Sequence, residues 1–140
     1  MKMVYILLVH TNADQIVRLI TRLNTPQTRF VIHVSQNCEP GLFETLTAAA
    51  QQFPNIDFSK RCKVKWGNAD LLQALLNCIK LIVSEAYQYD RVYILSGQDY
   101  PLQSNTEISE TLAHFEGKQI MEYFPLPDEA RGVGEGRAPQ

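Results

Sequence analysis

Apolar and polar residues alternate along the chain in blocks that predict strands and helices in turn. Short continuous apolar or β-branched runs predict strands at residues 3–9, 29–35, 61–66, 90–95 and 117–124. Apolar positions at helical spacing predict helices that follow residues 12, 41, 67 and 104. Strict alternation of this kind is typical of a parallel sheet covered by helices on both faces. We therefore predict an α/β, Rossmann-like fold.

Capping signals and apolar stripes define the predicted helices more closely. Asn12 stands as an N-cap with Gln15 three residues later, ahead of apolar Ile16, Leu19, Ile20 and Leu23. Ser104 and Glu107 form a second capping box. The helix at 42–53 is expected to end before Pro54. The helix after Gly67 is predicted to carry one apolar side, made of Leu71, Leu72, Leu75, Ile79, Ile82 and Val83.

The end of the chain has a different composition. Residues 125–140 are rich in proline, glycine and charge and contain little that a core could bury. Such a segment is expected to form a loop or to be disordered. The predicted organisation is therefore one α/β domain at 1–124, followed by a tail at 125–140.

Composition and charge exclude several classes of protein. The chain has 140 residues, 45% hydrophobic residues and a net charge of −2, which fits one domain without a basic surface for nucleic acid. The apolar run at 3–9 is too short to span a bilayer and has no signal-peptide pattern. Cys38, Cys62 and Cys78 form no CxxC pair, so we expect reduced thiols in a cytosolic compartment.

Polar residues follow each predicted strand end. Ligands of open parallel α/β sheets bind beyond the carboxyl ends of the strands. The residues that leave these ends are at 10–12, 33–35, 66–68 and 96–99. Gly97 is expected to permit a backbone geometry that other residues resist, and Pro101 ends the strand. We expect these four exits to share one crevice.

Each candidate side chain also has a purely structural alternative. A buried histidine with satisfied hydrogen bonds is favoured over a ligand at His33, which lies inside a predicted strand. Trp66 can cap the core, and Asp99 can cap the turn before Tyr100 and Pro101. Three common motifs are absent: GxGxxG for dinucleotides, GxxxxGK[ST] for phosphates and GxSxG for hydrolases.

Four blocks, read together, carry a family resemblance. They are LLVHTN, FVIHVS, VKWGNADLLQALLNCIK and YILSGQDYPLQSNTEI. In this order they resemble glycosyltransferase family 14, which comprises core-2/I-branching β-1,6-N-acetylglucosaminyltransferases and peptide O-xylosyltransferases. The resemblance covers about residues 4–123, most of the chain.

The resemblance implies a GT-A type fold and an inverting transfer of GlcNAc or xylose from a UDP-sugar to a glycan or protein hydroxyl. It also implies no metal and no cofactor, because Gly97-Gln98-Asp99 stands where other enzymes carry a metal-binding DxD motif. Asp99 would then bond the donor's ribose or sugar hydroxyls, His10 and residues 33–35 would face the uridine, and Trp66 with Gly67 would flank the pocket. The donor-binding residues expected are His10, Asn12, His33, Ser35, Trp66, Gly67, Ser96, Gly97, Gln98 and Asp99.

The same resemblance implies that catalytic parts are missing. In the family the general base and the cations that hold the leaving diphosphate come from the second half of the domain. We therefore expect a donor-binding N-terminal half that is inactive in isolation, with Glu122 as a weak candidate for the base. The alternative is a nucleotide-binding or regulatory α/β module without turnover. The expected location is cytoplasmic, peripheral to the inner membrane of a bacterium that builds surface glycans, or the Golgi membrane in a eukaryote.

Overall fold

The computed structural model describes residues 1–65 and 67–121 and groups the chain into two units, Met1–Asn105 and Thr106–Gln140. The first unit contains a four-stranded parallel sheet in the order β3-β2-β1-β4. Along the chain its elements are β1 (Met3–Val9), α1 (Ala13–Leu23), β2 (Thr28–Val34), α2 (Leu42–Ala50), β3 (Ile56–Phe58), α3 (Asp70–Ser84) and β4 (Arg91–Ser96). The remaining described helix is α4 (Asn105–Ala113).

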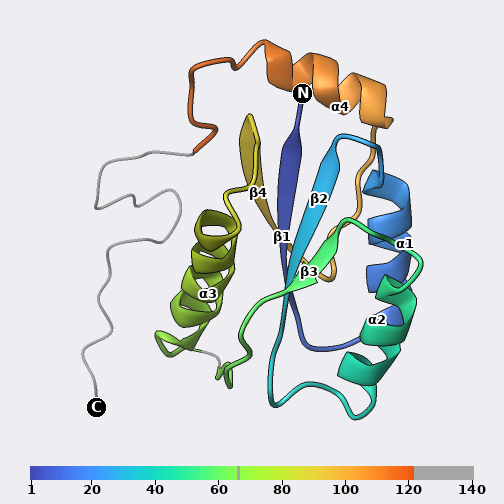
Figure 1. Ribbon diagram of the computed structural model, residues 1–140, viewed down its shortest axis with the longest axis vertical. Helices are drawn as coiled ribbons and strands as arrows, with labels where there is room; N and C mark the ends of the chain where they lie inside the picture. The colour runs from blue at the N-terminus through green and yellow to red at the C-terminus, as the bar shows by residue number, and fades with distance from the viewer. Residues whose placement is uncertain (66, 122–140) are drawn as a thin grey trace, which may run out of the picture. The chain divides into compact units, whose positions relative to one another are not determined.

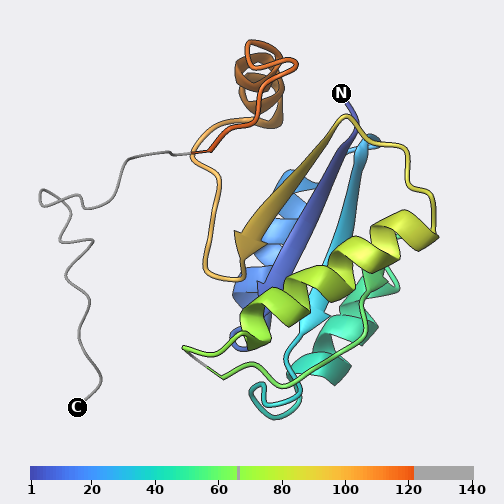
Figure 2. The same cartoon turned by 90° about the vertical axis from the view of Figure 1, so that its left-hand side faces the viewer.

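Helices cover both faces of this sheet, as the alternating pattern predicts. Figures 1 and 2 show α1 and α2 on one face and α3 on the other. Val4, Ile6 and Val31 of the central strands pack against Cys78 and Ile82 of α3. On the opposite face, Ile16, Leu19, Ile20 and Leu23 of α1 are all buried. The α/β, Rossmann-like class is therefore confirmed.

The two central strands and the first helix agree closely with the sequence. β1 has the predicted bounds, and β2 is shifted by one residue. Asn12 caps α1 as predicted, because its side-chain oxygen accepts the Gln15 amide at 3.3 Å. α2 ends at Ala50, three residues early, because the amides of Gln51 to Phe53 bond three residues back in tight turns.

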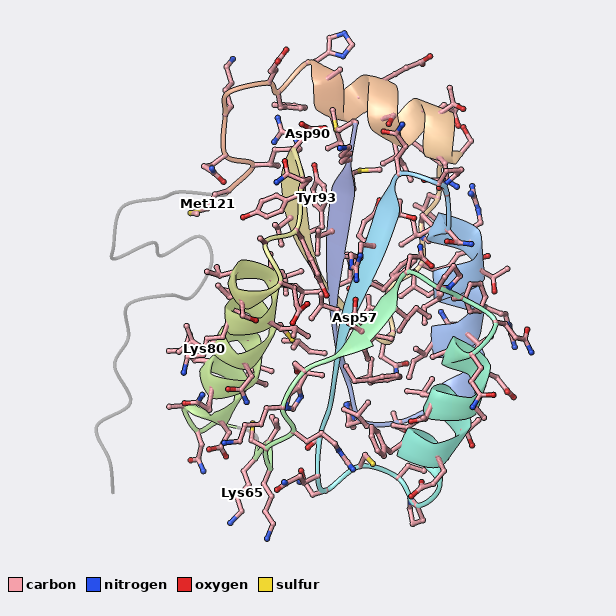
Figure 3. All side chains as sticks on the ribbon, viewed as in Figure 1. Asp57, Lys65, Lys80, Asp90, Tyr93 and Met121 are labelled. Atoms are coloured by element: carbon pink, nitrogen blue, oxygen red, sulfur yellow. The ribbon has the colours of Figure 1, made fainter. Side chains whose placement is uncertain are left out.

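The predicted third strand is wrong. The strand lies at Ile56–Phe58 and pairs with Phe30 to Ile32 of β2, whereas residues 61–65 form no strand. This segment bonds side chains instead of a neighbouring strand: the Cys62 amide donates to His33 Nε2 at 3.1 Å, and the Val64 amide donates to Asn37 Oδ1 at 3.0 Å. Figure 3 shows Asp57 on β3 and, further along the chain, Lys65 near the ends of β1 and β2.

Three further expectations need correction. The apolar residues of α3 do not share one buried side: Leu71, Leu72, Ile79 and Val83 are exposed, while Ala74, Cys78 and Ile82 are buried. Gly97 does not have a positive φ. A glycine suits this position because there is little room for a side chain: a Cβ there would lie 3.1 Å from Ile16 Cγ1 and from Val9 Cγ1. Residues 117–121 form no strand. Residues 122–124 of that predicted strand, and the tail at 125–140, lie outside the described residues.

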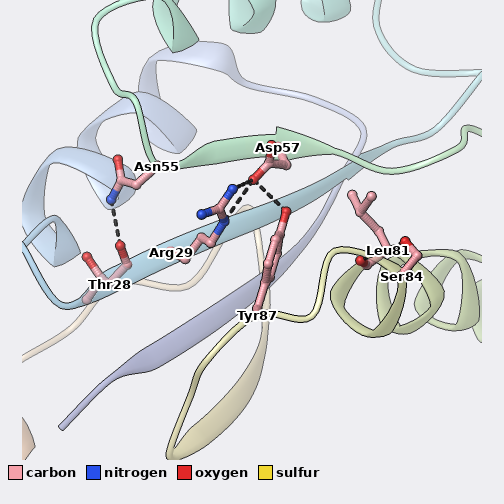
Figure 4. Close-up of polar contacts among 7 residues, drawn as sticks. All are labelled: Thr28, Arg29, Asn55, Asp57, Leu81, Ser84 and Tyr87. Atoms are coloured by element: carbon pink, nitrogen blue, oxygen red, sulfur yellow. Dashed lines mark hydrogen bonds and ion pairs between the residues drawn. The ribbon is translucent and has the colours of Figure 1, made fainter.

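A polar cluster fastens the short edge strand β3 to its neighbours (Figure 4). The Arg29 guanidinium pairs with Asp57 Oδ2 at 2.7 Å and lies 4.0 Å from the centre of the Tyr87 ring. The Tyr87 hydroxyl donates to the same carboxylate oxygen at 2.7 Å. Burial, followed by the bond to Asp57, raises the pKa of Tyr87 to about 12, which keeps the phenol a donor. The cluster links β2, β3 and the end of α3.

No helix in the described part of the chain is long and apolar enough to cross a membrane. All the cysteines are free, and Cys78 is buried in the core under α3. Burial raises the pKa of the Cys78 thiol, which favours the neutral form. Cys78 therefore packs in the core as a small apolar residue does.

Candidate functional site

A cavity of about 710 Å³ opens beyond the carboxyl ends of β1, β2 and β4, and we call it the rim cavity. Its size lies within the range of small-molecule sites, roughly 300–1,000 Å³. Residues from four separate segments line it. They are Leu8, Val9, His10, Thr11, His33, Ser35, Asn37, Val64, Lys65, Gly67, Asn68, Leu71, Ser96, Gly97 and Gln98.

The exit of β1 is held by a carboxylate from the next loop. Glu39 accepts hydrogen bonds from the Thr11 hydroxyl and from the Asn12 amide, the latter at 3.0 Å. The Glu39 amide in turn donates to the His10 carbonyl at 2.8 Å. Asn12 has a φ of 64°, a left-handed conformation that asparagine tolerates better than most residues. These bonds fix His10 and Thr11 at the cavity wall, while Asn12 itself serves as the helix cap.

The exit of β2 forms a second wall with the segment before α3. The Ser35 hydroxyl bonds the Asn37 amide oxygen, and both oxygens accept the Val64 amide, at 3.2 and 3.0 Å. The Asn37 amide nitrogen donates back to the Val64 carbonyl at 3.1 Å. These two side chains therefore stabilise the wall itself.

His33 has a structural role in this geometry. Its side chain is buried, and its Nε2 accepts the Cys62 amide at 3.1 Å, so the ring proton lies on Nδ1. Burial, assisted by the positive charge of Arg61, lowers the pKa of His33 and favours the neutral ring. His33 lines the rim cavity, but its Nε2 already accepts a hydrogen bond from within the protein. The arrangement matches the structural alternative for this residue.

The exit of β4 is a tight turn that Asp99 closes. Asp99 Oδ2 accepts the Ser96 amide at 2.7 Å, and the Ser96 hydroxyl accepts the Gln98 amide at 3.1 Å. Gln15 of α1 donates to the Asp99 carbonyl at 3.4 Å. Ser96, Gly97 and Gln98 consequently line the cavity, whereas Asp99 lies behind them as a turn cap.

The structure brings together most of the predicted site residues. His10, His33, Ser35, Gly67, Ser96, Gly97 and Gln98 line the rim cavity, but Asn12 and Asp99 do not. Trp66 and Glu122 lie outside the described residues. Whether any of these residues binds a donor stays a prediction.

Sequence reasoning missed Asn37, Val64 and Lys65, and it placed Thr11 and Asn68 at the strand exits without counting them as donor-binding residues; all of these residues line the cavity. The available signal was position: all five follow or neighbour a predicted strand end or the start of α3. Within the described ranges, no three His, Cys, Asp or Glu side chains gather as a metal site would require. The polar side chains that line the cavity carry hydroxyl, amide, imidazole and ammonium groups.

A parallel α/β sheet with a cavity beyond its carboxyl strand ends is the arrangement of nucleotide-binding α/β domains. The family model of the core-2/I-branching enzymes matches residues 3–132. The chain belongs to this family, and the resemblance of its sequence blocks is confirmed.

Relatives of known name fall into two groups. Over 91% of its length the chain is 31% identical to the human N-acetyllactosaminide beta-1,6-N-acetylglucosaminyl-transferase. Over 84% it is 29% identical to the Danio rerio beta-1,3-galactosyl-O-glycosyl-glycoprotein beta-1,6-N-acetylglucosaminyltransferase 4. Over 76% it is 32% identical to the xylosyltransferase oxt of Drosophila pseudoobscura pseudoobscura. The matched regions span 32%, 28% and 12% of these relatives, respectively.

Proposed function

We propose that this chain forms the donor-binding part of an inverting glycosyltransferase that uses no metal. The enzyme would transfer GlcNAc or xylose from a UDP-sugar to a hydroxyl group of a glycan or protein. Support for the sugar class comes from the relatives, which are named as acetylglucosaminyltransferases and a xylosyltransferase. The location stays a proposal with two alternatives: cytoplasmic and peripheral to the inner membrane, or at the Golgi membrane if the chain comes from a eukaryote.

The observation that carries this proposal is the set of uncommitted polar side chains in the rim cavity. His10, Asn68 and Gln98 are exposed there, and their side chains make no hydrogen bond with a described residue. They approach from three segments, whereas Leu8, Val9 and Leu71 supply apolar surface. A nucleoside needs this combination, because its base presents an apolar face and its edges and ribose present donors and acceptors.

In the proposed mechanism the chain binds and orients the donor, so that the acceptor hydroxyl attacks the anomeric carbon opposite the diphosphate. Orientation of this kind can supply a large part of the rate enhancement. Asp99 would hold the turn at Ser96 to Gln98 against the donor. No carboxylate stands among the described residues of the cavity wall, and we expect the general base to come from residues outside that wall.

A second candidate is a nucleotide-binding module without turnover. The same lack of a carboxylate in the described wall favours it. Release of UDP from UDP-GlcNAc or UDP-xylose, measured with a β-galactoside or a serine peptide as acceptor, distinguishes the two. Turnover establishes the transferase, and donor binding without turnover favours the module.

A thermal-shift titration with UDP and GDP, in Mg²⁺ or in EDTA, tests the donor site. Ligand at about 100 times its dissociation constant stabilises a fold by about 2.7 kcal/mol, which raises the unfolding midpoint measurably. We expect a shift with UDP that EDTA leaves unchanged and that GDP does not reproduce. Gln98→Ala should reduce the shift, and Gln88→Ala, outside the rim cavity, should not. An EDTA-sensitive shift would contradict the metal-free proposal.

A further inference from the structure

We propose that Arg61 is a positioning residue of the rim cavity, whose guanidinium group holds the exit of β2 in the shape that binds the donor; this rests on the proposed function. Arg61 is half-buried and begins the segment 61–65, which contributes Val64 to the cavity wall. Arg61 itself does not line the cavity. It would therefore act through residues that do, chiefly Ser35 and Asn37 at the exit of β2.

The Arg61 side chain replaces backbone donors that a longer β3 would provide. Just beyond β3, the Ser59 amide still donates to the Ile32 carbonyl of β2 at 3.0 Å. Further along, Arg61 Nε donates to the Val34 carbonyl at 3.0 Å, and its Nη2 donates to the Ser35 carbonyl at 3.0 Å. One planar group thus satisfies two successive backbone acceptors where the ladder of strand bonds has ended.

The guanidinium group is also fixed from the side of α2. Its carbon lies 4.2 Å from the centre of the Phe43 ring, and Phe43 in turn meets Phe58 of β3 edge-on, with 5.8 Å between ring centres. Among the described residues Arg61 forms no ion pair. Its position is therefore set by a ring on one face and by the two carbonyls at its edge, a combination that suits the flat arginine fork and not an ammonium group.

The exit of β2 and the segment 61–65 are tied in both directions. Arg61 reaches from the segment to the backbone of β2, whereas Ser35 and Asn37 reach back and accept the Val64 amide. The side-chain oxygens that line the cavity are the same oxygens that hold the segment. Loss of the guanidinium group should therefore let these oxygens shift, without removing any group that touches the donor.

His33 reports on the guanidinium group. Its Nε2 accepts the Cys62 amide at 3.1 Å, and the Cys62 thiol, whose pKa is raised by burial, lies 3.3 Å from the same nitrogen. Burial and then the positive charge of Arg61 lower the pKa of His33. If Arg61 lies beside His33 in solution, removal of its charge should raise the pKa of His33.

The structural alternative is an arginine that stabilises the fold and has no effect on the donor. Arg29 provides the matched control, because it is also half-buried, also links β2 to β3 and also stacks on an aromatic ring, that of Tyr87 (Figure 4). Arg29 does not line the rim cavity, and its partner Asp57 does not either. Arg29→Met should therefore destabilise the fold without changing the cavity.

The test measures dissociation constants for UDP by NMR titration of the wild type, Arg61→Met, Arg61→Lys and Arg29→Met. Titrations are done at about pH 8, where histidine is neutral, and at a temperature at which the amide spectrum shows each variant folded. We expect Arg61→Met to weaken UDP binding by about 5- to 10-fold, because a less organised site must be ordered on binding. Arg61→Lys should also weaken it, since an ammonium group cannot bridge the two carbonyls in the same way. Arg29→Met should leave it unchanged.

The pKa of His33, followed by NMR of the ring, separates charge from geometry. It should rise in Arg61→Met and stay near the wild-type value in Arg61→Lys and Arg29→Met. Wild-type affinity in Arg61→Met or in Arg61→Lys, an equal loss in Arg29→Met, or a His33 pKa that does not rise in Arg61→Met would overturn the role of Arg61 and leave the donor site intact. A wild type that does not bind UDP would instead contradict the proposed function, and the assignment of Arg61 with it.

Discussion

Glu39 ties two loops together at the rim cavity, since one carboxylate oxygen accepts both the Thr11 hydroxyl and the Asn12 amide. These bonds, the hydroxyl first, lower the pKa of Glu39 below its ordinary value of 4.5. The folded state therefore binds the Glu39 proton less readily than the unfolded state does. Its stabilising contribution is fully present above pH 4.5 and is lost as the pH falls through the lowered pKa.

Glu39→Gln should reveal this dependence. At neutral pH the variant should unfold at a lower temperature than the wild type, because a neutral amide is a weaker acceptor than a carboxylate. The two midpoints should converge as the pH falls through the lowered pKa. Thermal unfolding followed by circular dichroism over a pH series measures the difference, with Glu85→Gln, away from the Glu39 contacts, as a control. A difference that stays constant with pH would contradict the account of Glu39.

At this scale the sequence predicts where polar residues lie better than it predicts what they do. His10, Ser35 and Gln98 could be placed at one rim because parallel strands end at the same edge. The sequence left open whether Asp99 caps a turn or faces a ligand, and whether His33 is a core residue. Those roles depend on backbone amides, Ser96 for Asp99 and Cys62 for His33. In the case of Cys62, the amide lies far away in sequence.

At the scale of elements, α3 has more apolar residues than the sheet can cover. Ile82 is buried at 3% exposure against the central strands, whereas Val83, the next residue, is 70% exposed. A hydrophobic stripe therefore overstates the buried side of this helix. The pattern predicts the helix correctly but cannot distinguish which of two adjacent apolar residues faces the sheet.

This difference predicts unequal effects of two adjacent substitutions. Ile82→Ala should lower the free energy of unfolding by about 2–5 kcal/mol, because it removes buried methyl groups and leaves a cavity. Val83→Ala should change it by about 0.5 kcal/mol or less, as exposed substitutions usually do. Urea unfolding followed by fluorescence gives both values. Similar losses in the two variants would show that the outer side of α3 is covered in solution.

β1 was predictable because a continuous apolar run of seven residues has few alternatives to a buried parallel strand, and β2 because its apolar residues are mainly β-branched or aromatic. β3 was not, because it has only three residues and its sequence, Ile-Asp-Phe, carries little signal. Its place is set by pairing with β2 and by the Arg29–Asp57 ion pair, which are long-range interactions. The segment 61–65 resembled a strand, yet its amides bond side chains at the exit of β2.

At the scale of the molecule, the sheet of the first unit presents two ends of different character. The carboxyl ends of β1, β2 and β4 surround the rim cavity, whose described wall has one cation and no carboxylate. Away from this end, Arg29 of β2 and Asp57 of β3 bond each other and Tyr87, which follows α3. The alternation of strands and helices was sufficient to predict that the carboxyl ends of the strands lie together at one edge of the sheet, because every strand runs in the same direction.

The most direct test of the central claim is an amide NMR titration of the chain with UDP. The account predicts saturable shifts at the amides of Thr11, Ser35, Val64 and Gln98, around the rim cavity. It predicts none at Arg29, Asp57 and Tyr87, at the other end of the strands. Saturable shifts centred on that second set, or a spectrum that UDP leaves unchanged, would contradict the assignment of the rim cavity as the donor site.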